Sequence, residues 1–431
     1  MDRTRNYFNQ VTGSIVYKFF SVIASFFAIP LMIASLGLEK FGIWSTLLTI
    51  LNWFIFFDLG LGNGLRNRVA ERLSLGDSLE AKHYISSAYS FTAIFAVVIW
   101  IALYIASYFV PWQAAFNTKT VSEELLRNSF VIASFFILIN FCIGLITALL
   151  GAVQRSAMVA FGQMFANICI LAFLVVGQKN SIISIFSLSV IYGVSIVFGN
   201  LVLSYLFFSL RKELLPRINF SWAIFKPLIA PSLRFFVIQL AALVLFTTDK
   251  LIISGLFGPM HVAEYEIVFK LFGIITLVHA LVSAPLWSAY TEAYTKGEIN
   301  WIKVTLNRQI LFVVALAGFS ALLVYLSGSI IKLWIREEVP ISFHLTISMG
   351  IFVVLTAWNN VFATLVNGLG KIGVQFYASI VVMILNIPLS IYFARVAEFG
   401  VSGVVIGTLV SMLIGAILLP IHVLLILKKE T

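Results

Sequence analysis

Seven charged residues lie deep inside long apolar stretches of this chain, where a charge is costly and usually faces a cavity or a partner. The cations are Lys18, Arg234, Lys250 and Lys270. The acids are Asp58, Asp249 and Glu266. Lysine and arginine at close range could bind an anionic group such as a pyrophosphate. Buried carboxylates could couple movement to H⁺ or Na⁺. We therefore treat the four cations as candidates for substrate binding and the three acids as candidates for ion coupling.

Two of the cations also have a plain structural explanation. Lys18 belongs to a polar stripe with Ser14, Ser21 and Ser25, at the spacing of one helical face, which favours a position in a cavity. Its long side chain could instead reach the lipid headgroups. Arg234 lies close to a basic segment and could simply set the orientation of the chain in a membrane.

The other candidates cluster between residues 249 and 279. Asp249 and Lys250 point about 100° apart on a helix, so they need not pair with each other. Glu266 and Lys270 are four residues apart in the order that favours a structural ion pair. The sharper hypothesis is that Lys270 contacts phosphate and Glu266 takes up protons. His279 is expected to be a packing residue rather than a proton relay.

No familiar cofactor motif accompanies these charges. The glycines of DLGLGNG, residues 58–64, lack the strand–loop–helix setting of a phosphate-binding loop, and GLGKIG, residues 368–373, lacks its Ser or Thr. The only cysteines, Cys142 and Cys169, lie in apolar runs, which supports neither a disulfide framework nor a zinc site. We predict no cofactor and no metal.

Composition places the candidate residues in a membrane protein. The chain of 431 residues is 61% hydrophobic and 11% charged, whereas soluble domains carry about 25% charged residues. Long unbroken apolar runs indicate helices rather than the alternating strands of a barrel. The sequence predicts an all-α polytopic membrane protein with about twelve spans. They are residues 11–36, 43–62, 84–110, 129–150, 158–176, 182–209, 232–256, 263–288, 305–329, 343–366, 374–396 and 401–426.

Positive charge predicts the orientation. With the N-terminus inside, seventeen of the 28 Lys and Arg residues fall on the inner side and seven on the outer side. Short cytoplasmic loops retain such residues, so both termini are predicted to be cytoplasmic. This distribution explains most of the formal charge of +10 without a nucleic-acid partner. No connection is long enough for a soluble domain, so we expect function within the membrane and no enzyme active site.

The chain also contains an internal repeat. Residues 31–51, LMIASLGLEKFGIWSTLLTIL, match residues 251–272, LIISGLFGPMHVAEYEIVFKLF, at an offset of about 220. ERLSLGD at 71–77 matches EAYTKGE at 292–298, and LGAVQRSAM at 150–158 matches NGLGKIGV at 367–374. Six spans separate the partners, as in transporters built from two parallel repeats. We predict two pseudo-symmetric six-helix bundles around a central cavity, residues 1–210 and 232–431, joined by a cytoplasmic linker at 211–231.

Two segments resemble a known family. LGLEKFGIWSTLLTILNWFIFFDLGLGNGLRNRVAE, residues 36–71, and APLWSAYTEAYTKGEINWIK, residues 284–303, are similar to O-antigen flippases. These belong to the polysaccharide-transport branch of the multidrug/oligosaccharidyl-lipid/polysaccharide exporter superfamily. The resemblance covers essentially the whole chain, but it carries no fixed set of functional residues.

The resemblance implies transport of an undecaprenyl-pyrophosphate-linked oligosaccharide from the cytoplasmic to the periplasmic leaflet of a bacterial inner membrane. Membrane lipid and other polysaccharide-assembly membrane proteins would then be its partners. The main alternative is a cation-coupled multidrug exporter of the same superfamily, which would need an acid-dominated cavity. A membrane enzyme such as a polymerase or ligase would need convergent acid and base groups that the chain does not offer.

Overall fold

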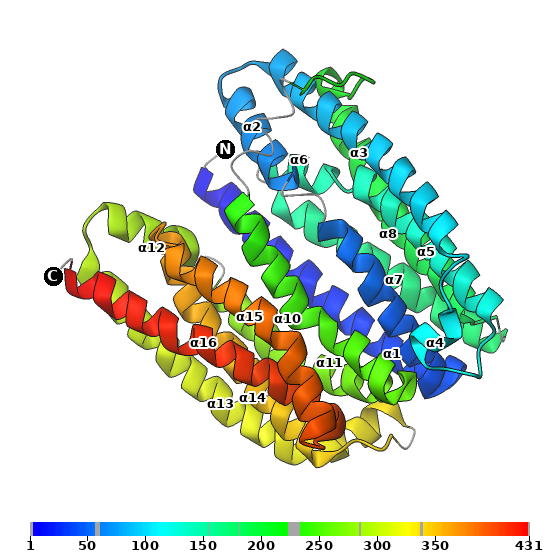
Figure 1. Ribbon diagram of the computed structural model, residues 1–431. Helices are drawn as coiled ribbons and strands as arrows, with labels where there is room; N and C mark the ends of the chain where they lie inside the picture. The colour runs from blue at the N-terminus through cyan, green and yellow to red at the C-terminus, as the bar shows by residue number, and fades with distance from the viewer. Residues whose placement is uncertain are drawn as a thin grey trace. The chain divides into compact units, whose positions relative to one another are not determined.

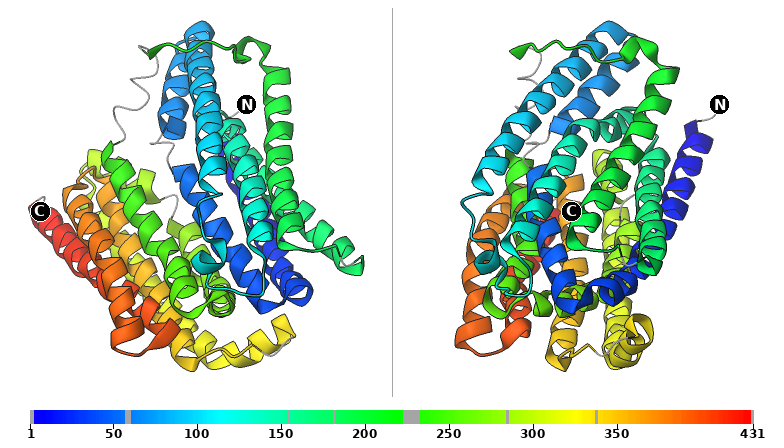
Figure 2. Two further views of the ribbon diagram at one scale, coloured as in Figure 1. Left: turned by 45° about the vertical axis from the view of Figure 1, so that its right-hand side comes forward. Right: turned by 90° about the vertical axis from the view of Figure 1, so that its right-hand side faces the viewer.

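A computed structural model describes residues 3–56, 61–153, 155–180, 182–222, 233–283, 286–336 and 339–429. Within these ranges the chain forms helices and no strands. It divides into two compact units, Met1–Phe236 and Val237–Thr431. Inside each unit the long helices lie side by side (Figures 1 and 2). The prediction of an all-α polytopic fold is confirmed.

Unit 1 is built from six long or medium helices and three short ones. They are α1 (Arg3–Phe56), α2 (Leu61–Ser74), α3 (Ser78–Ala106), α4 (Trp112–Phe116), α5 (Glu123–Ile143), α6 (Ile146–Ala152), α7 (Ser156–Lys179), α8 (Ile185–Leu210) and the 3₁₀ turn Lys212–Leu214. α7 packs along α1, and α8 packs along α5 and α7. The segment after α8 stays with this unit, because the backbone N–H groups of Arg217 and Asn219 donate to the hydroxyls of Ser86 and Ser90 on α3.

Unit 2 contains the remaining helices. They are α10 (Leu233–Phe257), α11 (Pro259–Ser283), α12 (Leu286–Thr295), α13 (Ile299–Ile335), α14 (Phe343–Gly368), α15 (Gly373–Ile391), the π-helical turn Tyr392–Val396 and α16 (Gly400–Lys429). α14 packs against α11, α13 and α16, and α15 packs along α16. α14 therefore lies at the centre of this unit.

Eleven described helices are long and apolar enough to cross a membrane. The first of them, Thr12–Leu51, is interrupted at Gly37, whose φ of 76° and ψ of 164° are not helical. It therefore consists of two apolar segments, which accounts for the difference from the twelve predicted spans. Spans seven and eight are joined by Gly258 alone, since α10 ends at Phe257 and α11 begins at Pro259.

Three short helices were not foreseen. α2, α4 and α12 occupy stretches that the sequence suggested were connections between spans. α2 carries Arg66, Arg68 and Arg72, and α12 carries Trp287 and Tyr290. A search for spans overlooks such helices because they are too short or too polar to cross a bilayer.

The internal repeat is visible in the backbone. Gly37 and Gly258, 221 residues apart, both adopt positive φ, at 76° and 95°. Gly76 and Gly297, again 221 apart, have φ of 76° and 71°. Glycine meets little steric penalty in this conformation, so each pair serves the same turn in its unit.

Hydrogen bonds around these glycines repeat in the same register. The N–H of Asp77 donates to the carbonyl of Arg72 at 2.9 Å, and the N–H of Glu298 donates to that of Ala293 at 2.8 Å. The third matched pair agrees at an offset of 216. There the N–H of Arg155 donates to Leu150 at 2.8 Å, and that of Lys371 donates to Val366 at 3.1 Å. The two halves are therefore structural repeats.

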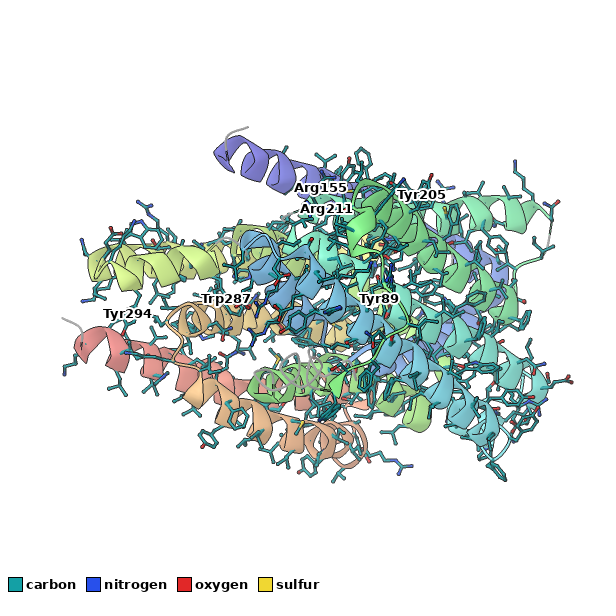
Figure 3. All side chains as sticks on the ribbon, turned by 90° about the horizontal axis from the view of Figure 1, so that it is seen from above. Tyr89, Arg155, Tyr205, Arg211, Trp287 and Tyr294 are labelled. Carbon is teal, nitrogen blue, oxygen red and sulfur yellow. The ribbon has the colours of Figure 1, made fainter. Side chains whose placement is uncertain are left out.

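The outer surface of the helices is apolar. Figure 3 draws the described side chains, and those projecting from the helices are mostly carbon. Large apolar residues such as Phe19, Val97, Leu311 and Leu424 are exposed. In water such a surface would associate or aggregate, whereas lipid chains cover it at little cost. The protein is a multi-pass membrane protein.

Candidate functional site

A buried carboxylate lies in unit 2. Asp249, on α10, is 1% exposed. Its Oδ2 accepts a hydrogen bond from the Tyr265 hydroxyl on α11 at 3.3 Å, and its Oδ1 accepts one from Thr408 Oγ1 on α16 at 2.9 Å. Burying an ionised carboxylate is costly unless its oxygens are satisfied or its charge is neutralised. These two hydroxyls supply part of that compensation.

The hydrogen bonds continue to a fourth helix. Asn386, on α15, donates from Nδ2 to Thr408 Oγ1 at 3.0 Å. Its Oδ1 accepts from Thr248 Oγ1, on α10, at 3.1 Å. Asn386 and Thr408 are both fully buried. We call the group formed by Thr248, Asp249, Tyr265, Asn386 and Thr408 the Asp249 network.

The charge of Asp249 is not balanced by an ion pair within the part of the chain that the structure describes. The carboxylate accepts hydrogen bonds from two hydroxyl groups, and hydroxyl and carboxylate oxygens are hard ligands of the kind that small cations prefer. A proton on the carboxylate would neutralise it equally well. In the described part of the chain, no group of three His, Cys, Asp or Glu residues could hold a metal ion.

A second cluster lies on α10 and α11. Lys250 Nζ is 2.5 Å from Glu266 Oε2, and both side chains are about one-sixth exposed, at 16% and 17%. Lys270, on α11, lies within electrostatic range of both. Glu266 thus forms an ion pair across the two helices with Lys250, while Lys270, four residues along α11, lies within electrostatic range of it. The formal charge of these three side chains together is +1.

The adjacent residues Asp249 and Lys250 point to different partners, as their angular separation predicts. Asp249 faces Tyr265 and Thr408, whereas Lys250 reaches Glu266. One α-helix thus presents a hydrogen-bonded acid and an ion-paired cation to different neighbours. The structure brings together three predicted site residues, Lys250, Glu266 and Lys270, and places Asp249 beside them on α10.

Within the described residues, the structure brings none of the other predicted residues, Lys18, Arg234 and Asp58, into either cluster. Lys18 is exposed on α1 in unit 1, while Ser21 of the same stripe is buried and its Oγ accepts from Asn167 Nδ2 on α7 at 2.7 Å. Arg234 lies in the first turn of α10, but its side chain is outside the described residues. Asp58 lies outside the described residues altogether.

His279 behaves as the packing residue that the sequence suggested. It is 1% exposed, its Nε2 lies 3.1 Å from Ser283 Oγ, and its ring stacks on Phe312. By contrast, sequence reasoning missed Tyr265, Asn386 and Thr408. Apart from one serine stripe and His279, the sequence signals inside the spans were charged residues. An asparagine within an apolar span was the signal that could have identified Asn386.

Comparison with known proteins places the chain in a family. The profile of the polysaccharide biosynthesis protein family matches residues 9–286, more than half of the chain. A second profile, MatE, matches residues 235–392. A Salmonella typhimurium protein described as an O-antigen transporter is 26% identical over 426 residues, covering 89% of this chain and 88% of that protein. A Yersinia pseudotuberculosis protein described as an O-antigen export protein is 22% identical, covering 91% and 90%.

Solved structures confirm the fold. An inward-facing multidrug resistance MATE transporter superposes with a TM-score of 0.78 at 16% identity, over 97% of this chain and 99% of that chain. The lipid II flippase MurJ superposes with a TM-score of 0.68 at 18% identity, over 95% and 87%. The relatives with sequence similarity are described as an O-antigen transporter and an O-antigen export protein, in agreement with the prediction of a transporter rather than an enzyme. The resemblance to O-antigen flippases is confirmed as well, and the chain belongs to the polysaccharide biosynthesis protein family.

Proposed function

We propose that this protein flips an undecaprenyl-pyrophosphate-linked oligosaccharide, the repeat unit of O-antigen or a related surface polysaccharide. Movement would run from the cytoplasmic to the periplasmic leaflet of a bacterial inner membrane, with both termini cytoplasmic. The O-antigen relatives support this class of cargo. The observation that carries the proposal is the joint placement on α10 and α11 of a net-positive cluster and a separate buried acid.

The net-positive cluster would bind the pyrophosphate. Lys250, Glu266 and Lys270 together carry a formal charge of +1. Lysine is a common phosphate ligand, and a low-dielectric setting strengthens the attraction. Lys18 and Arg234 would contribute further positive charge along the path of the cargo. The apolar polyprenyl tail would remain among the lipid chains throughout transport.

The Asp249 network would couple transport to an ion gradient. Uptake of H⁺ or Na⁺ neutralises Asp249 and thereby changes the cost of keeping its carboxylate buried. Such a change can shift the balance between two conformations. Glu266 and Asp58 remain further candidates for coupling. We further propose that bundles 1–210 and 232–431, joined by a cytoplasmic linker at 211–231, alternate access to a central cavity.

Reconstitution tests the proposal. Proteoliposomes would contain a defined undecaprenyl-pyrophosphate-linked oligosaccharide, and a membrane-impermeant glycosidase would report the fraction in the outer leaflet. The wild type should equilibrate the lipid, and Lys270→Ala should slow it about tenfold, since a charge-assisted contact contributes about 1.5–3 kcal/mol. Lys212→Ala, an exposed cation on the turn after α8, is the matched control.

The same vesicles test the remaining assignments. Lys18→Ala should also slow flipping if Lys18 lies along the cargo path. Normal flipping by both Lys270→Ala and Lys18→Ala would refute the site while leaving the function intact. Unchanged flipping after collapse of both the H⁺ and the Na⁺ gradient would refute coupling. A wild type that never moves the lipid would refute the proposed function.

Export of organic cations is the second candidate, and the MatE match over residues 235–392 favours it. It would need a cavity dominated by acids, whereas the cluster on α10 and α11 carries a formal charge of +1. Direct binding distinguishes the two functions. The flippase should bind undecaprenyl pyrophosphate and exclude a cationic dye such as ethidium, and the reverse preference would identify a drug exporter.

A further inference from the structure

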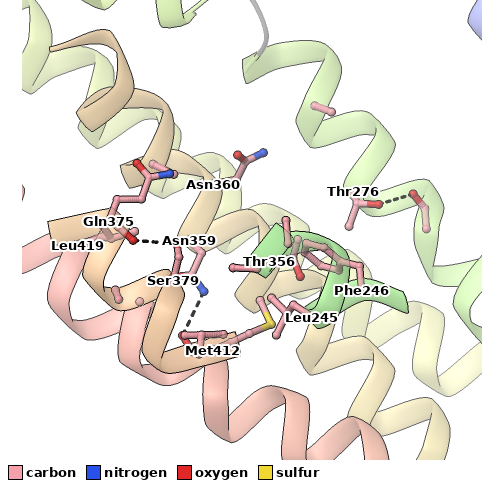
Figure 4. Close-up of a pocket in the computed structure, with 18 of the residues that line it drawn as sticks. Leu245, Phe246, Thr276, Thr356, Asn359, Asn360, Gln375, Ser379, Met412 and Leu419 are labelled. Atoms are coloured by element: carbon pink, nitrogen blue, oxygen red, sulfur yellow. Dashed lines mark hydrogen bonds between the residues drawn. The ribbon is translucent and has the colours of Figure 1, made fainter. Parts of the chain in front are cut away.

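A segment outside the spans exposes large apolar side chains. It consists of residues 211–222, which follow α8 and which we call the strap; Figure 2 draws it in green where α8 ends. Ile218 is fully exposed, and Leu215, Phe220 and Trp222 are exposed by 53%, 44% and 62%. The strap belongs to unit 1, and it contributes neither to the charged cluster of α10 and α11 nor to the pocket of unit 2 that Figure 4 shows. Its apolar surface therefore requires a partner of its own.

The backbone of the strap is fixed to α3. The 3₁₀ turn at its start buries Leu214 completely in the apolar core of unit 1. Beyond the turn, the N–H of Arg217 donates to Ser86 Oγ at 3.1 Å, and the N–H of Asn219 donates to Ser90 Oγ at 3.2 Å. Two residues of extended chain advance about 6.6 Å and four helical residues about 6 Å, so both hydrogen bonds fit one turn of α3. The strap therefore follows α3 over this stretch.

The contact with α3 sets the depth of the strap. α3 has 29 residues, about 43 Å, whereas the hydrocarbon core of a membrane is about 30 Å thick. Lys82 is the last charged residue of α3, so Ser86 and Ser90 lie about one and two turns into its apolar part. There the ring of Phe220 stacks on Phe91, with centroids 6.4 Å apart and planes 27° apart. The strap therefore lies at the level where lipid headgroups meet acyl chains.

Basic residues accompany the apolar residues of the strap. Arg211, Lys212 and Arg217 outnumber the single acid, Glu213, so the strap carries a formal charge of +2. None of these four residues takes part in an ion pair within the described part of the chain. The guanidinium of Arg211 instead lies 5.8 Å from the ring centroid of Phe207 on α8. Phosphate groups of anionic lipids would balance this positive charge.

A lipid leaflet fits this combination better than water or a soluble protein. In water, the exposed apolar surface of Ile218 and Trp222 would cost free energy. A soluble protein does not reach side chains beside the first turns of a span, because lipid surrounds the span there. Tryptophan is enriched at this level of a membrane, since its ring is apolar and its N–H is polar. Further along α3, exposed apolar residues such as Val97 continue the same lipid-facing surface.

We propose that the strap is a binding site for anionic phospholipids of the leaflet beside it, which is the cytoplasmic leaflet in the predicted orientation. Ile218 and Trp222 insert among the upper parts of the acyl chains, and Arg217 meets a headgroup phosphate. The hydrogen bonds to Ser86 and Ser90 hold the strap at this depth. The ligand is a lipid of the membrane itself, so the site does not depend on the cargo proposed above.

Fluorescence quenching in vesicles of phosphatidylcholine and phosphatidylglycerol tests the depth of the strap. The full-length variant Cys142→Ala/Cys169→Ala receives a bimane label at Ile218→Cys. A nitroxide near the carbonyl end of the acyl chains should lower the emission at least about twofold, as expected for a side chain about 5–10 Å into the boundary of headgroups and acyl chains. Aqueous iodide should leave the emission unchanged. A label at Glu213→Cys, an exposed charged position on the 3₁₀ turn, is the matched control and should show the reverse pattern.

Two results would overturn this depth. If iodide and not the nitroxide lipid quenched the Ile218→Cys label, the strap would lie in water. If neither quenched it, protein rather than lipid would cover the strap. Trp222 gives a second measurement that leaves the cysteines in place. The emission that the wild type has and Trp222→Phe lacks should be quenched by phosphatidylcholine brominated in the upper part of its acyl chains, and unquenched emission would contradict the proposal.

Arg217→Gln tests the preference for anionic lipid in the protein labelled at Ile218→Cys. The same nitroxide should quench more on phosphatidylglycerol than on phosphatidylcholine. This excess should fall about fivefold in Arg217→Gln, since a basic residue near an anionic surface contributes about 1 kcal/mol. Lys179→Gln makes the same charge change at the end of α7, beside the start of α8 rather than its end, and should leave the excess unchanged. Equal quenching by the two lipids without either substitution, or equal losses in the two variants, would overturn the anionic ligand.

Discussion

The two halves of the molecule build the same turn with different residues. With Gly37 and Gly258 as equivalent positions, the offset of 221 pairs Asp249 with Ala28 and Lys250 with Ile29. It also pairs Glu266 with Ser45 and Lys270 with Thr49. Unit 1 therefore has only small, apolar or hydroxyl side chains where unit 2 has four charges.

This difference separates what the fold needs from what function needs. Ala28, Ser45 and Thr49 are buried, and the hydroxyl of Thr49 donates to the carbonyl of Ser45 within its own helix. Unit 1 thus forms the same arrangement without charge. Charges at membrane depth cost free energy, and unit 2 carries four of them at positions where unit 1 carries none. We propose that they serve transport.

The largest effect should come from placing an acid in unit 1. Ala28→Asp would bury a carboxylate where the neighbouring side chains are apolar, and an uncompensated buried charge costs about 3–5 kcal/mol. Thermal unfolding in detergent should show a large loss of stability. Ala28→Leu, which changes volume without charge, controls for crowding. If Ala28→Asp were as stable as the wild type, unit 1 would also offer partners for an acid. The difference between the two units would then be contradicted.

A smaller effect should follow from converting unit 2 toward unit 1. Lys250→Ile removes the ion-pair partner of Glu266 and should lower the unfolding free energy by about 2 kcal/mol, less than for a fully buried pair. The double variant Lys250→Ile/Glu266→Ser should recover part of this loss, because neither charge remains. Chemical denaturation of all four members of the cycle measures the coupling. Additive effects would show that the pair contributes nothing.

Thr408→Val should have a moderate effect. It removes the 2.9 Å hydrogen bond to Asp249 and the acceptor for Asn386 without changing the side-chain shape. We expect a loss of about 1–2 kcal/mol in unfolding free energy. Thr46→Val is the control in unit 1, since the Thr46 hydroxyl bonds only its own helix, to Gly42, in the described contacts. Equal losses for the two variants would remove any special role for the network.

The smallest effect concerns α12 and α2, where Tyr290 pairs with Val69 at the same offset. Both are buried, and the Tyr290 hydroxyl has no hydrogen-bond partner among the described residues. Tyr290→Phe should therefore change the unfolding free energy by less than about 1 kcal/mol at pH 7.

Alkaline pH should reveal the effect of the buried Tyr290 hydroxyl on stability. Burial raises the pKa of Tyr290 from 10.0 to about 12. The folded state therefore holds this proton more tightly than the unfolded state, and the stability so gained is present below pH 10 and is lost as the pH rises from 10 to about 12. Unfolding free energies of the wild type and Tyr290→Phe should diverge only in that window. A difference that appears below pH 9 would contradict this explanation.

The sequence predicted the scaffold better than the site. Hydropathy identified the spans, and the glycine-centred matches identified the repeat, because both depend on local properties of the chain. The helical spacing of Glu266 and Lys270 says nothing about a neighbouring helix, so the approach of Lys250 to Glu266 was not foreseen. Asn386 and Thr408 were missed because they are uncharged and lie more than 130 residues from Asp249 in the chain.

Transport by Asp249→Asn tests the central claim that the charges of unit 2 serve function rather than folding. Asparagine keeps the shape and removes the charge, so the unfolding temperature should stay within a few degrees of the wild type or rise, since no carboxylate is buried. Flipping of the lipid-linked oligosaccharide in proteoliposomes under an imposed ion gradient should fall at least about tenfold. Wild-type flipping, or a collapse of thermal stability, would contradict the account.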